Sequence, residues 1–303
     1  MFASKRVLGI ALVALGSVFW STAGLFVRLL DMDIWTMMVW RSLFAALSLG
    51  LIFVGRHGRA TPAALHALGR PGLLAIPISA VSMFCYVASL KLTTVANVMM
   101  VYATLPFVGA GLSFLAMGER PKKHVLGASF VALAGVAIIA GSSTRMADVA
   151  GNSLALVMTL TFAVLLVIAR RFPTLDMAPV NGFAAVICAA ACWPLSSEVV
   201  PSLGSLGLLA LFGSLTSGVA YLLVLTGGRY IPSSETGLVG FLDVVLAPLW
   251  VWFAFAEQPS TAALIGGAFV FAALVYYLLR ELRAEDPVDR PSGRAKPLPD
   301  TVG

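Results

Sequence analysis

Charged side chains are scarce in this chain. They make up 11% of its 303 residues, whereas a soluble domain carries about 25%. Hydrophobic residues reach 59%. Apolar runs of the ~20 residues that cross a bilayer fill nearly everything from Val7 to Leu279. This composition excludes a soluble protein and predicts an integral membrane protein without a separate soluble domain.

Motifs for catalysis and metal binding are also lacking. No Gly-Lys pair occurs, which excludes a Walker A site for ATP. The His-Glu-x-x-His zinc motif and the Gly-x-Ser-x-Gly nucleophile motif are missing as well. The only cysteines, Cys85, Cys188 and Cys192, fall in apolar runs, where we expect small core residues rather than disulfides or metal ligands. We therefore expect no enzyme activity, no metal and no cofactor.

The apolar runs predict ten transmembrane helices and an all-α fold. The first run follows Lys5 and Arg6 but is too long for a signal peptide, so we interpret it as the first helix. The predicted spans are 7–30, 35–54, 71–91, 94–117, 123–141, 150–170, 177–195, 205–227, 233–255 and 260–279.

The positions of the positive residues predict the orientation. If the N-terminus is cytoplasmic, sixteen of the twenty Lys and Arg fall on the cytoplasmic side. Only Arg28, Lys91 and Arg145 fall outside, and Arg41 lies within a span. Because cytoplasmic loops carry an excess of Lys and Arg, we expect both termini in the cytoplasm.

One unit of the sequence occurs twice. The pattern S-x-x-S-x-x-x-Y appears at residues 79–86 and 214–221, and each copy is followed by Glu-x-Pro, at 119–121 and 257–259. The repeats are expected at 1–143 and 144–283, with a disordered tail at 284–303 that is rich in Pro and charge. Because five spans is an odd number, the two repeats must be inverted. Such repeats are the usual framework of secondary transporters.

The repeated pattern places polar side chains on one helix face. Ser79, Ser82 and Tyr86 share a face in the first copy, as do Ser214, Ser217 and Tyr221 in the second. Serines on a membrane helix serve helix packing as readily as a cavity, and the aligned tyrosines favour a cavity. Inversion would put the two tyrosines at opposite depths, where they could gate one site.

Asp243 is the acidic residue placed midway along a predicted span, and burial there is costly. It could neutralise a substrate ammonium group, carry a coupling proton or act as a structural acceptor.

Arg41 is six residues inside its span, where snorkelling to the interface is favoured over anion binding. Pro106 and Pro248 are expected to interrupt the fourth and ninth helices. Trp20, too deep for an interfacial belt, could stack on a flat substrate.

These features together resemble the EamA-type branch of the drug/metabolite transporter superfamily. The resemblance rests on Pro106 followed by Gly-Glu-Arg-Pro at 118–121, and on Pro248 followed by Glu-Gln-Pro at 257–259. It also rests on the short connections 90–97 and 229–235. It implies export of small metabolites across the bacterial inner membrane through a cavity bordered by both halves, and within the family the chain looks most similar to aromatic amino-acid exporters. Ala256 replaces the motif glycine in the second copy, and Asp243 is outside the shared motif.

We therefore predict a transporter that exports small hydrophobic or aromatic metabolites, chiefly amino acids, by alternating access. Its partners would be the substrate and the lipid bilayer, without nucleic acid. A multidrug or nucleoside exporter is the alternative, and a non-transporting receptor or assembly subunit is an alternative of another class. The predicted substrate-binding residues, with Asp243 also a candidate for coupling, are Trp20, Ser79, Ser82, Met83, Tyr86, Tyr102, Thr216, Ser217, Tyr221, Phe241 and Asp243.

Overall fold

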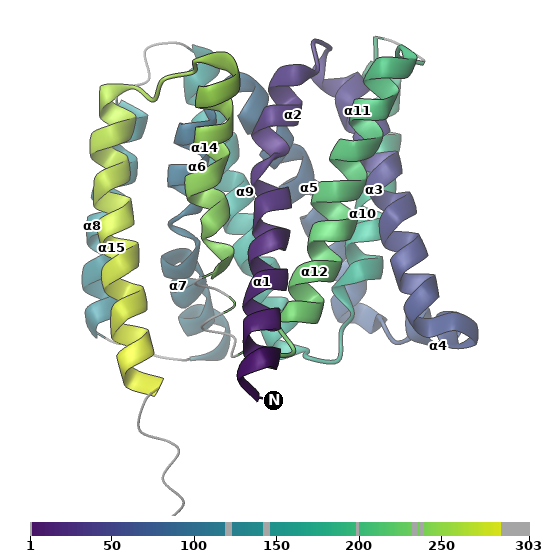
Figure 1. Cartoon of the computed structure of the whole chain (residues 1–303), viewed down its shortest axis with the longest axis horizontal. Helices are drawn as coiled ribbons and strands as arrows, with labels where there is room; N and C mark the ends of the chain where they lie inside the picture. Colours follow the sequence, from purple (N-terminus) through teal and green to yellow (C-terminus); the bar gives the residue numbers. More distant parts are fainter. Residues whose placement is uncertain are drawn as a thin grey trace, which may run out of the picture.

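A computed structural model of the chain shows a bundle of helices (Figure 1). It describes residues 2–118, 123–141, 146–197, 200–231, 236 and 239–285. The Glu-x-Pro motif at 119–121, residues 232–235 and the tail beyond 285 lie outside the described residues. The main helices are α1 (Phe2–Ser21), α2 (Ala23–Leu29), α3 (Ile34–His57), α4 (Thr61–His66), α5 (Gly69–Leu92), α6 (Val95–Tyr102), α7 (Leu105–Met117), α8 (Lys123–Gly141), α9 (Met146–Arg171), α10 (Met177–Cys192), α11 (Leu203–Gly213), the π-helix η3 (Ser214–Val219), α12 (Ala220–Gly227), α14 (Leu242–Phe255) and α15 (Thr261–Glu285).

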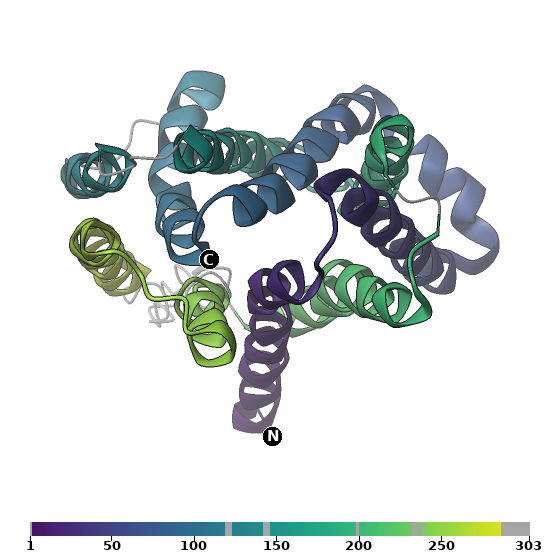
Figure 2. The ribbon, with the colours of Figure 1, turned by 90° about the horizontal axis from the view of Figure 1, so that it is seen from above.

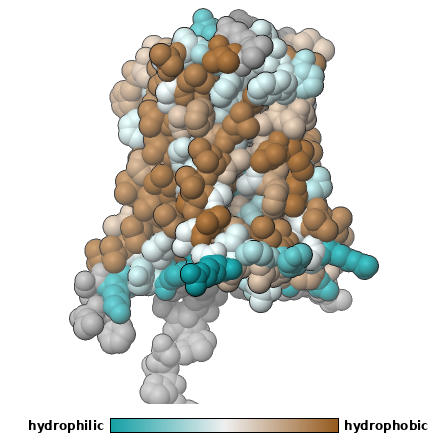
Figure 3. All heavy atoms as spheres, turned by 90° about the vertical axis from the view of Figure 1, so that its right-hand side faces the viewer, coloured by the Kyte–Doolittle hydropathy of each residue, from teal (hydrophilic) through white to brown (hydrophobic). Residues whose placement is uncertain are grey.

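The bundle has the dimensions and surface of a membrane protein. Within the described ranges, seven helical segments are long and apolar enough to cross a membrane, and three further apolar segments are shorter: Val125–Ile138, Leu242–Phe255 and Thr261–Tyr277. Apolar side chains cover the middle of one face, and hydrophilic ones gather at its lower end (Figure 3). The chain is therefore a multi-pass membrane protein, and the count of ten spans stays a prediction.

The helix contacts repeat between the two halves of the chain. Within each half the long helical segments follow the same order, so α3 corresponds to α10 and α8 to α15. These corresponding helices pack against each other, α8 beside α15 at one side of the bundle (Figure 2). The contact between α5 and α9 is matched by that between α12 and α1. Exchanging the halves therefore reproduces these helix contacts.

The two halves begin at opposite ends of the bundle. Thr93, after α5, donates its hydroxyl to Asp148 in the first turn of α9, at 3.1 Å. The carbonyl of Thr93 also accepts from Arg28 near the end of α2, at 2.9 Å. Thus α9 begins where α2 ends. The start of α1 and the end of α15 both lie at the lower end (Figure 1).

Corresponding aspartates cap the corresponding helices α3 and α10. Asp33 accepts from the amides of Trp35 and Thr36 at 2.9 and 3.0 Å, and Asp176 accepts from Ala178 at 2.9 Å. These bonds satisfy helix N-terminal amides that have no partner within the helix. Burial raises the pKa of Asp33, but hydrogen bonds from Ser197, Thr36 and the backbone lower it by more, so its pKa lies below the ordinary value.

Besides the π-helix η3, three helical segments are irregular near the centre of the bundle. α1 and α2 are separated at Thr22, whose hydroxyl donates to the Phe19 carbonyl at 2.6 Å. α6 ends before residues 103–104, just upstream of Pro106 as expected. Pro248, however, lies inside α14, which continues through it, so the predicted interruption there is wrong. The irregularity is instead at Phe241, immediately before α14.

Close packing fixes the second copy of the repeated pattern against α3. A Cβ on Gly213 would meet the Arg41 carbonyl oxygen and, at 2.9 Å, the Ala45 amide nitrogen. A Cβ on Gly218 would come within 2.6 Å of the Ser48 hydroxyl. Only glycine permits this approach, so Gly213 at the end of α11 and Gly218 in η3 hold this segment tightly to α3.

Candidate functional site

A cavity of about 200 Å³ lies between the irregular helices. Its lining comes from both halves of the chain, including α1, α3, α5, α6, α9, α10, η3, α12 and α14. Discontinuous helices near the membrane midplane commonly form transporter sites, because their free backbone groups are tolerated only beside protein or water.

The structure brings ten of the eleven predicted site residues to this cavity. Phe241 is not among the lining residues, and it packs against the main hydrophobic cluster instead. The reason is local geometry: Phe241 precedes α14, and successive residues of a helix point in directions about 100° apart. Asp243, two residues later, therefore reaches the cavity while Phe241 does not. The lining residues among those predicted are Trp20, Ser79, Ser82, Met83, Tyr86, Tyr102, Thr216, Ser217, Tyr221 and Asp243.

Asp243 lies in the first turn of α14, beside the helix irregularity. Its Oδ1 is buried and has no hydrogen-bond partner in the described part of the chain. Tyr86 and Tyr102 both lie within its electrostatic range. A buried carboxylate oxygen without a partner is costly, which makes it available to a proton or a cationic group.

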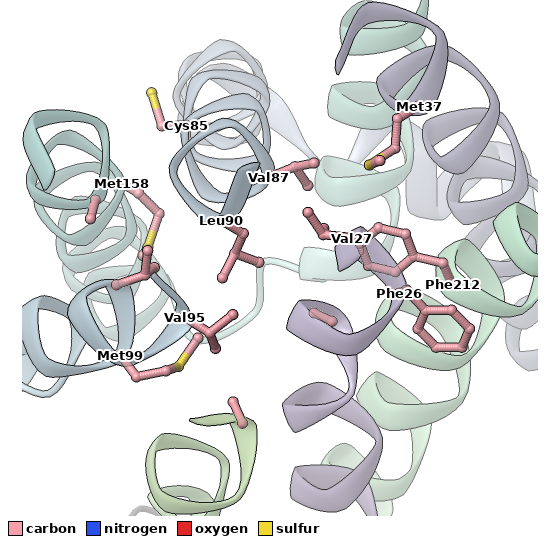
Figure 4. Packing of buried hydrophobic residues seen from close by; sticks show 14 of the residues in the cluster. Phe26, Val27, Met37, Cys85, Val87, Leu90, Val95, Met99, Met158 and Phe212 are labelled. Carbon is pink, nitrogen blue, oxygen red and sulfur yellow. The ribbon is translucent and has the colours of Figure 1, made fainter. Parts of the chain in front are cut away.

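Arg41 also faces the cavity, so the expectation that it snorkels to the interface is wrong. Arg41 is only 4% exposed to solvent, and its guanidinium carbon lies 4.8 Å from the centre of the Phe212 ring. That ring stacks on Phe26 at 5.4 Å (Figure 4). The direction of the Arg41 side chain depends on the neighbouring helices, which the sequence of one helix does not reveal.

The serines of the repeated pattern have two roles. Ser79 donates to the side-chain oxygen of Asn181 on α10 at 2.7 Å, and Ser82 makes a longer contact of 3.4 Å with the Met158 carbonyl on α9. Both also line the cavity. They therefore join helices across the two halves while bordering the space.

Other lining residues were not singled out in the sequence. Asn181 is the polar one, and the rest are apolar side chains with no pattern to distinguish them from core residues. Phe162 lies 6.1 Å from the Tyr102 ring and so extends the aromatic wall. These further lining residues are Ala23, Leu49, Met99, Met158, Phe162, Leu165 and Asn181.

A polar network joins helix ends above the cavity. Arg28 donates to Glu257 at 2.7 Å, to the Leu90 carbonyl at 2.6 Å and to the Thr93 carbonyl at 2.9 Å. Glu257 also accepts from the Val95 amide at 3.0 Å. This upper network, formed by Arg28, Leu90, Thr93, Val95 and Glu257, ties α2 and the α5–α6 connection to the segment after α14.

A second network lies at the opposite end. Arg56, near the end of α3, is paired with Asp176, the N-cap of α10, at 3.3 Å. His57 is 4.0 Å from the same carboxylate. Tyr221, which lines the cavity, interacts with both Asp176 and Arg56. This lower network of Arg56, His57, Asp176 and Tyr221 therefore connects one end of the bundle to the cavity wall.

Comparisons with known proteins identify the family. The EamA-like transporter family matches residues 7–141 and again residues 149–279. No curated protein matches the chain at a significant level. A solved structure described as "Crystal structure of protein" is similar, with a TM-score of 0.58 and 20% identity over 94% of this chain and 99% of that one. At this identity the likeness shows the fold alone. The two family matches cover most of the sequence, and the chain therefore belongs to the EamA-like transporter family, whose members are membrane transporters of small molecules rather than enzymes.

Proposed function

We propose that the protein exports small hydrophobic or aromatic amino acids across the bacterial inner membrane by alternating access. The observation that carries the proposal is one cavity in which aromatic rings surround an unpartnered carboxylate oxygen of Asp243. Trp20, Tyr86 and Tyr102 offer flat faces to an apolar side chain. A carboxylate oxygen without a partner suits the ammonium group that every amino acid carries.

The size of the cavity favours a small metabolite over a multidrug range. Sites for drug-sized ligands measure about 300–1,000 Å³, whereas this cavity measures about 200 Å³. A single amino acid is of the right order for such a space. Energy coupling would be a proton carried by Asp243 or the gradient of the substrate itself.

The proposed topology consists of two inverted five-helix repeats with both termini in the cytoplasm. We assign the repeats to residues 1–143 and 144–283, followed by a cytoplasmic tail at 284–303. The start of α9 at the end where α2 finishes supports the inversion. Arg28 and Lys91, both expected outside, lie close to each other at that end. Arg28 donates to the carbonyl of Leu90, next to Lys91, and Lys91 contacts the carbonyl of Leu30, two residues after Arg28.

Alternating access would be controlled by the two polar networks on either side of the cavity. Tyr86 interacts electrostatically with Asp243 and Arg41 in the cavity, and Tyr221 belongs to the lower network. We propose these tyrosines as rims facing opposite ends. Cysteine accessibility at residues 86 and 221 should then respond in opposite directions to substrate, and identical responses would contradict the gating role.

Flux measurements with the purified protein in liposomes test the function. We expect efflux of tryptophan, phenylalanine or leucine, and Trp20→Ala should weaken the apparent affinity for tryptophan about 3- to 10-fold through lost ring contacts. Trp193→Ala, at a half-exposed position away from the cavity, is the matched control. Broad flux of dyes or nucleosides would favour the multidrug or nucleoside alternative, and no flux of any compound would favour a receptor or assembly subunit.

A further inference from the structure

Arg41 is a buried cation whose hydrogen-bonding capacity is mostly unused. Its Nε and Nη1 have no hydrogen-bond partner within the described residues, and Nη2 makes only a 3.5 Å contact with the Ser217 hydroxyl. No ion pair joins Arg41 to Asp243 in the part of the chain that the structure describes. Both residues nevertheless line the same cavity.

The surroundings of Arg41 hold the charge in place without neutralising it. The Phe212 ring supports the guanidinium at 4.8 Å, and Phe26 supports that ring from behind. A cation over an aromatic face is stabilised while its edge donors stay free. The titratable groups that interact with it are Cys188 and Tyr86, a thiol and a phenol rather than carboxylates.

A buried charge that served packing alone would be expected to have its donors satisfied. Buried ions without partners are strongly unfavourable, and natural structures pair them. The planar guanidinium fork matches the geometry of a carboxylate, to which it donates two parallel hydrogen bonds. An anion entering the cavity would therefore complete the Arg41 site.

The cavity also holds the opposite charge at a separate place. Tyr86 interacts electrostatically with both Asp243 and Arg41, and all three side chains line the same cavity. A substrate with only an amine would leave Arg41 unpaired, and one with only a carboxylate would leave Asp243 unpaired. A zwitterion satisfies both at once.

We propose that Arg41 binds the carboxylate of the transported substrate while Asp243 binds its ammonium group. The site is then specific for zwitterionic amino acids, with the aromatic wall receiving the side chain. This inference rests on the proposed function and adds the residue that recognises the acid group.

Binding of matched analogues to the purified full chain tests the assignment. The probes are tryptophan, tryptamine, which lacks the carboxylate, and indole-3-propionate, which lacks the amine, with the corresponding phenylalanine and leucine series. We expect the amino acid of at least one series to bind about 10- to 100-fold more tightly than either analogue, the range typical of hydrogen bonds to charged groups.

Arg41→Gln should lower amino-acid affinity about 10- to 100-fold. It should leave the affinity for the amine analogue within about threefold, since the amine does not use the guanidinium. Arg41→Lys keeps the charge without the fork and should bind with intermediate affinity. If Arg41→Gln lowers the affinities for the amino acid and for the amine by the same factor, or lowers neither, the proposal is overturned.

Two outcomes distinguish this inference from the proposed function. If the unmodified protein transports amino acids but binds an amino acid and its amine equally, the role of Arg41 fails and the transport function stands. If it neither binds nor transports any of the three amino acids, the proposed function itself fails. The analogue comparison on the unmodified protein needs no variant, so it decides the matter even if Arg41→Gln does not fold.

Discussion

The upper network makes a quantitative prediction about opening of the cavity. Glu257→Gln keeps an oxygen that can accept from the Val95 amide but removes the negative charge that pairs with Arg28 at 2.7 Å. Hydrogen bonds to charged groups contribute about 1.5–3 kcal/mol. Both side chains are 21% exposed, so solvent screening reduces the expected loss to about 1–2 kcal/mol.

A loss of this size corresponds to a ~5- to 30-fold shift between closed and open states at the upper end. Cysteine labelling measures it. In a background without the three native cysteines, which are all buried, a single cysteine replaces Ser82 in the cavity wall. We expect a membrane-impermeant maleimide, added from the outer side, to label the Glu257→Gln variant ~5 to 30 times faster than its parent.

The opposite end supplies the control. Asp176→Asn weakens the ion pair with Arg56 in the lower network, and it should not speed labelling from the outer side. An unchanged rate in Glu257→Gln would refute the reasoning, because the ion pair would then not hold the upper end closed. Equal acceleration by both variants would refute it too, since it would indicate general loosening of the bundle.

Three further predictions concern coupling and stability. Asp243→Asn should abolish any dependence of export on a pH gradient, because the amide cannot carry a proton; retained pH dependence in liposome efflux would exclude Asp243 as the coupling residue. Gly213→Ala should destabilise the protein by about 1–3 kcal/mol through the clash with the α3 backbone. Gly207→Ala on the same helix, with open space around it, should not lower the stability in thermal unfolding. Asp33→Ala should cost about 0.5–2 kcal/mol at neutral pH by removing the helix cap. Because the pKa of Asp33 in the folded protein is lowered, this stabilisation is present above the ordinary aspartate pKa and is lost as the pH falls through the folded-state pKa. The melting temperatures of the unmodified protein and the Asp33→Ala variant should therefore converge in acid, and a constant difference would contradict the assignment.

The sequence was informative about which residues are polar at depth, and less so about where they point. Composition and repetition predicted the helical bundle and most of the cavity wall, because a polar residue in an apolar membrane helix is favoured to face the bundle interior or a water-filled cavity. The same reasoning failed for Arg41, since one helix does not reveal which neighbours it meets. The prediction also failed for Phe241, because the sequence does not reveal that its side chain packs against the main hydrophobic cluster while Asp243, two residues later, lines the cavity.

One local feature was readable in part from the sequence, and another was not. Asp33 and Asp176 each precede an apolar run, which is the signature of a helix cap, and their correspondence would have strengthened the repeat. The π-helix at 214–219 was not readable, because its copy at residues 79–84 is an ordinary part of α5 with the same S-x-x-S spacing. The second copy differs from the first in its close packing against α3 at Gly213 and Gly218, which the S-x-x-S pattern does not reveal.

The two charges in the cavity are not duplicated with the rest of the unit. Arg41 lies eight residues after the cap Asp33, and eight residues after the cap Asp176 stands Ala184, which is buried and apolar. Asp243 precedes Glu257 by fourteen residues, and the position fourteen before Glu119 is Leu105. Each half therefore supplies one charge, of opposite sign. A zwitterion held by both would bridge the halves, so its binding would favour whichever state brings Arg41 and Asp243 to the separation of the two charged groups, and would couple occupancy of the site to the relative motion of the repeats.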